Sequence, residues 1–190
     1  MADKKLHGLR VAILLTDGFE QVEMTEPRAA LDAAGATTTL VSPKSDTVQG
    51  MHHDKKGDTF PVDLTLTQAD GGDFDALLLP GGVANPDALR LEPKAIAFVA
   101  SFADKPIAAI CHGPWTLIDA GIAKGKRMTS WPSLKTDLRN AGADWVDQEA
   151  VTDGNVVTSR KPDDIPAFNE AMITLFARRD FSLQFGSALR

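Results

Sequence analysis

The fold is decided by the stretch Lys105-Pro-Ile-Ala-Ala-Ile-Cys-His-Gly-Pro-Trp-Thr-Leu-Ile-Asp-Ala-Gly121. Its first half, Ile107 to Ile110, is a short apolar run of the kind that forms a buried parallel strand. Its second half, Thr116 to Ala120, favours a helix that the following glycine ends. Between the two lies Cys111, the only cysteine of the chain. The pattern therefore predicts a strand that turns directly into a helix, with a cysteine at the corner.

Such a corner lies at the carboxyl edge of the sheet, where open α/β sheets hold their sites. The backbone N–H groups of the helix start favour an anion there, so we expect the pKa of the Cys111 thiol to be lowered. This is the geometry of a nucleophile elbow, with cysteine where hydrolases carry serine. The alternative is a small buried hydrophobic residue. The sequence His112-Gly113-Pro114 that follows favours the functional interpretation.

The composition is that of a globular protein, and we interpret residues 1–190 as a single domain, with a core over about 9–178 and a tail at 180–190. The net charge of −6 and the lack of a Lys/Arg block argue against nucleic-acid binding. One cysteine excludes an intramolecular disulfide and suits a reducing compartment. Because no apolar signal region and no run of about 18 apolar residues is found, we expect a cytoplasmic protein without a membrane span.

A second apolar run, Leu9 to Thr16, predicts another parallel strand. Asp17-Gly-Phe-Glu20 then leads into a helical segment that we expect Pro27 to break or kink. Because Glu20 follows the strand directly, it stands at the same sheet edge as Cys111. We attribute Glu23, three residues later, to the general preference for acids at helix starts.

A third apolar run, Asp75 to Pro80, leads into Gly81 and Gly82. Glycines let a backbone approach a ligand closely and present its amides to an anion. Since the same edge holds Cys111, we expect the amides of Gly81 and Gly82 to serve an oxyanion site.

The remaining segments complete an α/β pattern. Adjacent His52 and His53 lie in an irregular stretch, 45–67, that we interpret as a β-ribbon, and they form only a weak metal motif. No metal and no organic cofactor is predicted. We expect a strand at Thr37–Ser42, a turn at Pro86–Asp87, a short strand at Met128–Ser130, a hairpin around Asp153-Gly154, and helices at Glu92–Ala103, Pro132–Asn140 and Pro162–Arg179. The fold class predicted is α/β, a flavodoxin-like doubly wound parallel sheet sandwiched by helices, with a small β-ribbon.

Several ordered motifs together resemble the DJ-1/PfpI family, in particular its PfpI-like peptidase and general-stress-protein branch. They are Asp17-Gly-Phe-Glu-Gln-Val-Glu23, Leu79-Pro-Gly-Gly82, Ala109-Ile-Cys-His-Gly-Pro114, Thr129-Ser-Trp-Pro132 and Trp145-Val-Asp147. The fold and elbow are also similar to class I glutamine amidotransferases. Those enzymes take their base from a histidine far downstream of the cysteine. No histidine follows His112, so we exclude that activity.

The resemblance implies a role for each matching residue. Cys111 would be the nucleophile in a strained backbone conformation, and a protonated Glu20 would donate to its sulfur. His112 would be the base, and the amides of Gly82 and His112 would bind the oxyanion. The branch orients the histidine with an acid from a second subunit. The matching position here is Asp87, one methylene shorter than the glutamate of the family. The resemblance also implies a homodimer or higher homo-oligomer.

Three functions follow. The first is a cysteine hydrolase, peptidase-like or glyoxalase/deglycase-like, in which Cys111 attacks the carbonyl of a peptide or of a small carbonyl compound. The second is a non-enzymatic redox sensor in which Cys111 is oxidised to sulfenic or sulfinic acid. The third is a holdase-type stress chaperone, which needs an exposed apolar patch.

Overall fold

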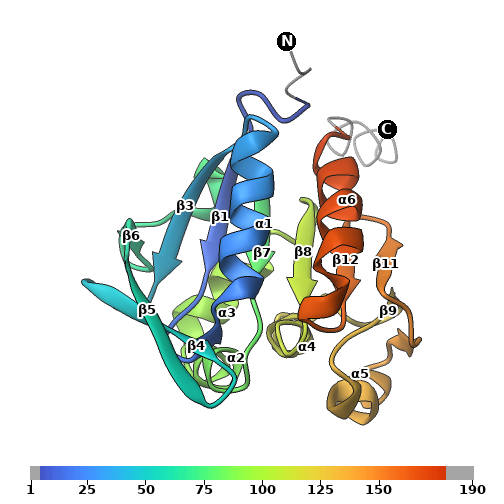
Figure 1. The fold of residues 1–190 in the computed structure, drawn as a ribbon. Coiled ribbons are helices and arrows are strands. Elements are labelled where there is room, and N and C mark those ends of the chain that lie inside the picture. Colours follow the sequence, from blue (N-terminus) through green and yellow to red (C-terminus); the bar gives the residue numbers. More distant parts are fainter. Residues whose placement is uncertain (1–4, 179–190) are drawn as a thin grey trace.

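A computed structural model describes residues 5–178 and centres on a seven-stranded sheet (Figure 1). The strand order is β11-β12-β8-β7-β1-β3-β6, and every pair is parallel except β11 with β12. Chain order runs outward from β1 in both directions, as in a doubly wound sheet, except that the hairpin strand β11 lies outside β12. The strands are β1 (Arg10–Leu14), β3 (Thr37–Ser42), β6 (Leu64–Thr65), β7 (Ala76–Leu79), β8 (Ile107–Ile110), β11 (Ala150–Asp153) and β12 (Val156–Ser159).

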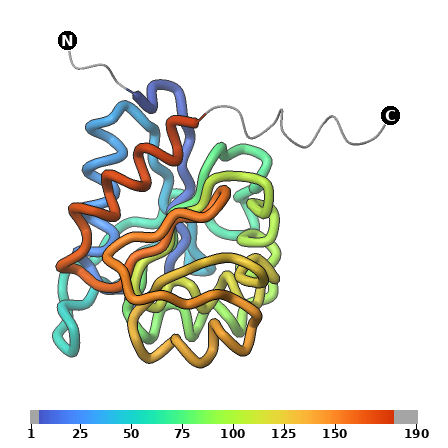
Figure 2. Tube along the Cα trace, turned by 90° about the vertical axis from the view of Figure 1, so that its right-hand side faces the viewer, coloured from blue at the N-terminus to red at the C-terminus, as the bar shows by residue number. Residues whose placement is uncertain are grey.

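Helices cover both faces of this sheet. Helices α1 (Val22–Ala33) and α6 (Ile165–Phe176) lie side by side on one face, as Figures 1 and 2 show. The other face carries α2 (Ala84–Arg90), α3 (Pro93–Ala100), α4 (Pro114–Asp119) and α5 (Lys135–Asn140). Single 3-10 turns occupy Gly71–Asp73, Pro132–Leu134 and Pro162–Asp164. The predicted fold class is confirmed.

The side chains of β1 alternate between two hydrophobic cores, one on each face of the sheet. Val11 and Ile13 pack with the α1–α6 layer, whereas Ala12 and Leu14 pack with the α2–α5 layer. All four side chains are fully buried. A strand buried on both faces needs apolar residues at every position, which is why the central strands read as continuous apolar runs.

A small three-stranded sheet lies beside the carboxyl end of β1. It orders β2 (Phe19–Glu20), β4 (Thr47–His52) and β5 (Lys55–Pro61), and β4 and β5 form the predicted ribbon (Figure 1). A parallel pair, β9 (Arg127–Met128) with β10 (Asp144–Trp145), lies at the opposite flank.

Two local predictions need correction. Pro27 does not break the first helix, because α1 runs unbroken from Val22 to Ala33. The alternative of a kink at Pro27 stays a prediction. Pro86 lies inside α2 where we expected only a turn. It is the third residue of that helix, and a first-turn residue needs no intrahelical N–H bond.

The C-terminal tail at 180–190 lies outside the described residues, so its interpretation stays a prediction. Among residues 5–178, no helix is both long enough and apolar enough to span a membrane.

Candidate active site

The carboxyl ends of β1, β7 and β8 meet at one edge of the sheet, where a cavity of about 770 Å³ opens. Cavities of this size hold ligands well beyond a few atoms. Residues from all three strand ends line it, together with the β4–β5 ribbon, and they include Glu20, Glu23, Lys56, Gly82, Cys111 and His112.

Cys111 forms the corner between β8 and α4, as predicted. Its φ of 62° lies in the left-handed region, which side chains other than glycine rarely adopt. The backbone is held there by two hydrogen bonds: the Cys111 N–H donates to Ser159 O at 3.0 Å, and its carbonyl accepts from Trp131 N at 2.9 Å. The next turn is tight enough that a Cβ at Gly113 would lie 2.6 Å from Leu79 O. The strained elbow implied by the resemblance is therefore present.

The carboxyl group beside the thiol belongs to Glu23. Its side chain is fully buried, and its Oε2 accepts from the Gly81 N–H at 2.9 Å. A Cβ at Gly81 would collide with this carboxyl and lie 2.6 Å from Cys111 Cβ, which shows how closely the three residues pack. Burial raises the pKa of Glu23 to about 8, so the carboxyl is mostly neutral at pH 7.

This placement corrects our expectation that Glu20 touches the sulfur. Glu20 is half-buried in β2, and its Oε2 accepts from the His53 N–H at 3.0 Å. It lines the same cavity but faces the ribbon. From the sequence, we attributed Glu23 only to the preference for acidic residues at helix starts. A sequence signal was available, because Glu23 shares the i, i+4, i+8 stripe of α1 with the buried Pro27 and Leu31.

His112 supplies the basic nitrogen. Its Nδ1 lies 3.2 Å from Cys111 Sγ, and its side chain is only 6% exposed. Burial lowers the pKa of His112, so the imidazole is neutral at pH 7 and Nδ1 can accept a proton. The ring stacks on Trp131, with centroids 6.0 Å apart, and meets Trp115 edge-on.

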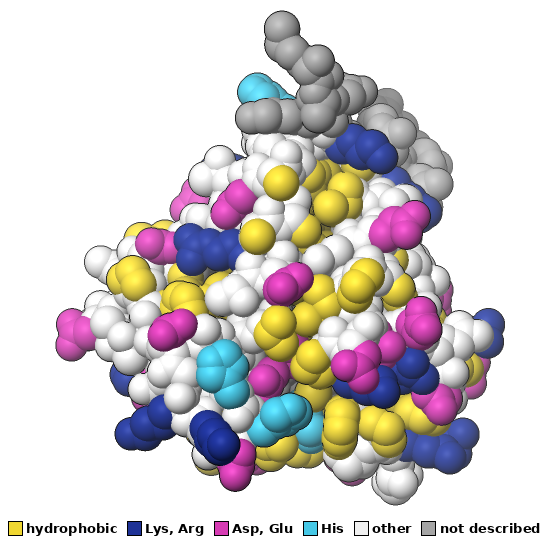
Figure 3. Space-filling view, viewed as in Figure 1, with side chains coloured by type: hydrophobic (Ala, Val, Ile, Leu, Met, Phe, Trp, Pro, Cys, Tyr) yellow, Lys and Arg dark blue, Asp and Glu magenta, His cyan; other side chains and the backbone are white. Residues whose placement is uncertain are grey.

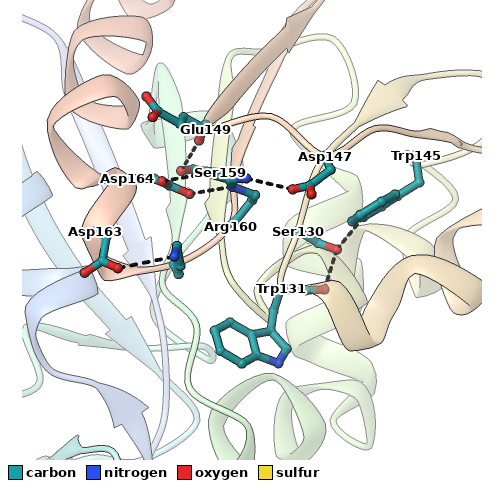
Figure 4. Close-up of polar contacts among 10 residues, drawn as sticks. Ser130, Trp131, Trp145, Asp147, Glu149, Ser159, Arg160, Asp163 and Asp164 are labelled. Atoms are coloured by element: carbon teal, nitrogen blue, oxygen red, sulfur yellow. Dashed lines mark hydrogen bonds and ion pairs between the residues drawn. The ribbon is translucent and has the colours of Figure 1, made fainter.

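Trp131 is a site residue to which the sequence pattern assigned no role. A chain of hydrogen bonds holds it: Trp145 Nε1 donates to Ser130 Oγ, which donates to the Trp131 carbonyl (Figure 4). Trp131 is 39% exposed and lines the cavity, so it forms a wall of the cavity as well as a support for His112.

Arg160 lies close by in the loop after β12. It bridges Asp147 and Asp164 and so fixes this loop (Figure 4).

The pKa of the thiol moves opposite to our expectation. Burial raises the pKa of Cys111, and the charged form of Glu23 raises it further, whereas the N–H groups of Gly82 and His112 lower it. The helix that follows has six residues, too short for its dipole to outweigh desolvation. Cys111 is therefore a thiol at rest, and a base must remove its proton.

The backbone N–H groups of Gly81 and Gly82 have different hydrogen-bond environments. The Gly81 N–H is engaged by Glu23, so it does not point to an oxyanion, contrary to expectation. The Gly82 and His112 amides face the sulfur, and the Gly82 amide also faces the Glu23 carboxyl. Asn85, which sequence reasoning missed, clamps the turn: its Nδ2 donates to Pro80 O and Gly81 O, and its Oδ1 accepts from Thr16 N.

Two expectations stay predictions: the cross-subunit role of Asp87, and the absence of a metal ion. Asp87 is exposed on α2 and is absent from the cavity lining, so its cross-subunit role stays a prediction. Within residues 5–178, no group of three or more His, Cys, Asp or Glu side chains is arranged to hold a metal ion.

Comparison with known proteins shows the family to which the chain belongs. The sequence profile of the DJ-1/PfpI family matches residues 9–175. A deglycase of Pyrococcus abyssi is 44% identical over 169 residues, covering 88% of this chain and 99% of that protein. General stress protein 18 of Bacillus subtilis is 42% identical over 176 residues, covering 90% and 99%.

A crystal structure of a two-domain protein from Anabaena variabilis, with DJ-1/ThiJ/PfpI-like and ferritin-like domains, superposes with a TM-score of 0.81. It is 34% identical, and the match covers 87% of this chain and 47% of that longer one. From the profile match, the relatives and the strained cysteine elbow alike, this chain belongs to the DJ-1/PfpI family.

Proposed function

We propose that the protein is a Cys111-dependent stress-response enzyme of the cytoplasm that acts on reactive carbonyl compounds, in the manner of a glyoxalase or deglycase. One observation carries this: the only cysteine, in a strained elbow, touches a neutral histidine and packs beside a neutral buried carboxyl at the floor of a cavity. Relatives named as deglycases and as a general stress protein support the same reading.

The chemistry balances for methylglyoxal without an outside oxidant. His112 takes the thiol proton, a C–S bond forms at the aldehyde carbon, and the carbonyl electron pair moves to oxygen near the Gly82 and His112 amides. The hydrogen on that carbon then leaves as a proton and returns to the neighbouring carbon through an enediol. Water hydrolyses the resulting thioester, releasing lactate and the Cys111 thiol. One carbon is oxidised and its neighbour is reduced.

The test is lactate formation from methylglyoxal. Cys111→Ser is expected to lose at least about 100-fold in kcat/KM, and His112→Ala about 10- to 100-fold. Glu23→Gln is expected to slow the reaction, and Glu20→Gln, the matched carboxylate removal in the same cavity, to slow it much less. Lactate formation at the wild-type rate by Cys111→Ser would refute the proposal.

A second candidate is a redox sensor, favoured by one observation. Glu23 Oε1 is buried and has no hydrogen-bond partner among the described residues. A protonated carboxyl there can donate to an oxygen added to the nearby sulfur. Two molecules of peroxide would convert the thiol to a sulfinic acid and release two molecules of water.

Intact mass after mild peroxide treatment separates the two candidates. A sensor gains two oxygen atoms in wild type and in His112→Ala, and gains them poorly in Glu23→Leu. An enzyme without a sensing role shows no such dependence on Glu23. A homo-oligomer, expected from the resemblance, enters this proposal only through Asp87, whose replacement by Ala would slow turnover if a second copy supplies it.

A further inference from the structure

The small β2-β4-β5 sheet forms one wall of the cavity, and its register aligns three different side chains. Glu20 pairs with Met51, and Met51 pairs with Lys56. Side chains in register on neighbouring strands project from the same face of a sheet. All three residues line the cavity, in agreement with that rule. The wall therefore presents a carboxylate, a thioether and an ammonium group in one row.

The two charged ends of the row are too far apart to neutralise each other. Neighbouring strands are about 4.8 Å apart, so the backbones of Glu20 and Lys56 are separated by roughly 10 Å. Within residues 5–178, Lys56 has no carboxylate within 4.0 Å, whereas Lys44 pairs with Asp17, which lines the same cavity. Lys56 thus brings an unpaired positive charge to the cavity.

The preceding residue shows that this placement is specific. Lys55 is also exposed, but it pairs with His52 and is absent from the cavity lining. Successive residues of a strand point to opposite faces, so only one of the two lysines can reach the cavity. Figure 3 shows basic, histidine and acidic side chains gathered at the lower left, over the β4–β5 ribbon.

We propose that Lys56 is a specificity-determining residue that binds a carboxylate on the substrate, so that the substrates are carbonyl compounds carrying a carboxylate at the end remote from the reacting carbon. This rests on the proposed function of Cys111. Glu20, at the other end of the row, repels an anion and so directs the carboxylate toward Lys56. Met51 supplies an apolar surface between the two.

The size of the cavity fits a substrate longer than methylglyoxal itself. A volume of about 770 Å³ is in the range that holds drug-sized ligands. Adducts of methylglyoxal with N-acetylcysteine or with a peptide carrying a free carboxyl end belong to this class. In such an adduct the hydrogen on the sulfur-bearing carbon moves as a proton to the neighbouring carbonyl carbon through an enediol, which gives a thioester. Cys111 then attacks that thioester, the N-acetylcysteine thiol leaves with the Cys111 proton, and water releases lactate, while the carboxylate contacts the ribbon.

Alkylation of Cys111 tests the charge of the wall without requiring turnover. Iodoacetate and iodoacetamide react with a thiol by the same displacement of iodide, but only iodoacetate carries a carboxylate. Because Cys111 is the only cysteine, the mass gain that wild type shows and Cys111→Ser lacks reports its reaction. The quantity measured is the ratio of the two rate constants, which cancels changes in the thiol itself.

Lys56→Glu is expected to lower the iodoacetate-to-iodoacetamide ratio by about three- to tenfold, as expected for reversing one charge several ångströms away in a partly hydrated cavity. Lys55→Glu, the matched control with the same net charge, is expected to change it less than about twofold. An unchanged ratio in Lys56→Glu, or an equal fall in both variants, overturns the inference while leaving the proposed function intact. If neither reagent labels wild-type Cys111, both fall.

Turnover of a matched substrate pair supplies the second measurement. The methylglyoxal adducts of N-acetylcysteine and of N-acetylcysteine amide differ only in the carboxylate. We expect Lys56→Glu to lower kcat/KM about tenfold for the acid and little for the amide. An equal effect on both adducts would assign Lys56 a structural role and overturn the inference.

Discussion

Cys111 Sγ lies 3.2 Å from Nδ1 of His112, its immediate neighbour in the chain. Adjacent side chains in regular structure point apart, so this contact depends on the left-handed backbone of Cys111. The same turn places both residues at the floor of the cavity. Strain in one residue thus creates the nucleophile–base pair.

The raised pKa of the Cys111 thiol predicts an alkylation rate that is still increasing above pH 9. Burial and the Glu23 carboxylate both disfavour the thiolate, so its fraction grows only at high pH. Glu23→Gln removes the second effect and is expected to move the profile to lower pH. The measurement is the iodoacetamide rate from pH 6 to 10.5. A wild-type plateau below pH 8 would mean that the helix start outweighs burial.

Glu23 also predicts a pH-dependent stability. Its pKa is raised from 4.5 to about 8 in the folded chain, so between these values the folded state binds more protons than the unfolded state. The contribution of the neutral Glu23 carboxyl to the free energy of unfolding is therefore complete below about pH 4.5 and is lost as pH rises through about 8. The free energy of unfolding falls by no more than about 1.4 kcal/mol per pH unit in this range.

Urea unfolding of wild type and Glu23→Gln at pH 5.5, 6.5 and 7.5 measures this effect. The amide does not titrate, so the free energy of unfolding of the variant is expected to rise relative to that of wild type as pH rises. A difference between the two proteins that is the same at all three pH values would show that Glu23 is already charged when folded.

Gly113 tests the tightness of the elbow. A Cβ there would lie 2.6 Å from Leu79 O and 2.9 Å from Ile110 O, and backbone atoms cannot move aside cheaply. Gly113→Ala is expected to destabilise the fold by about 2–4 kcal/mol. Gly125→Ala is the control, since its φ of 77° strains alanine but its Cβ meets nothing within 4 Å. It should cost about 1 kcal/mol. Equal losses in thermal unfolding would contradict the steric argument.

Arg160 is expected to stabilise the fold mainly through Asp164, one of its two carboxylate partners. Asp164 is 5% exposed and receives hydrogen bonds from both Nε and Nη2 of Arg160, whereas the Asp147 side chain is 65% exposed. Arg160→Met leaves a buried carboxylate without its partner and should cost about 2–4 kcal/mol. Asp147→Ala removes an exposed partner and should cost less than about 1 kcal/mol. Chemical denaturation compares the two, and a larger loss from Asp147→Ala would reverse this assignment.

Local patterns predicted the frame of the site well. Continuous apolar runs identified β1, β7 and β8, because a strand covered by helices on both faces has no polar side to reveal. Gly121 and Gly154, with φ of 73° and 58°, end α4 and turn the β11–β12 hairpin where the sequence indicated. The corner position of Cys111 followed from the same kind of local information, since a strand, a turn and a helix are contiguous in the chain.

What the sequence by itself determined is therefore the family, the parallel sheet and the cysteine at the elbow. Only the tertiary structure decided which acid meets the sulfur, because Phe19 and Glu20 pair with the distant strand β4 and leave Glu23 to enter the core. It also decided the direction of the thiol pKa, which depends on burial by segments from all along the chain. Lys56 reaches the cavity for the same reason. Strand register and burial are set by contacts between residues far apart in sequence, and no local pattern encodes them.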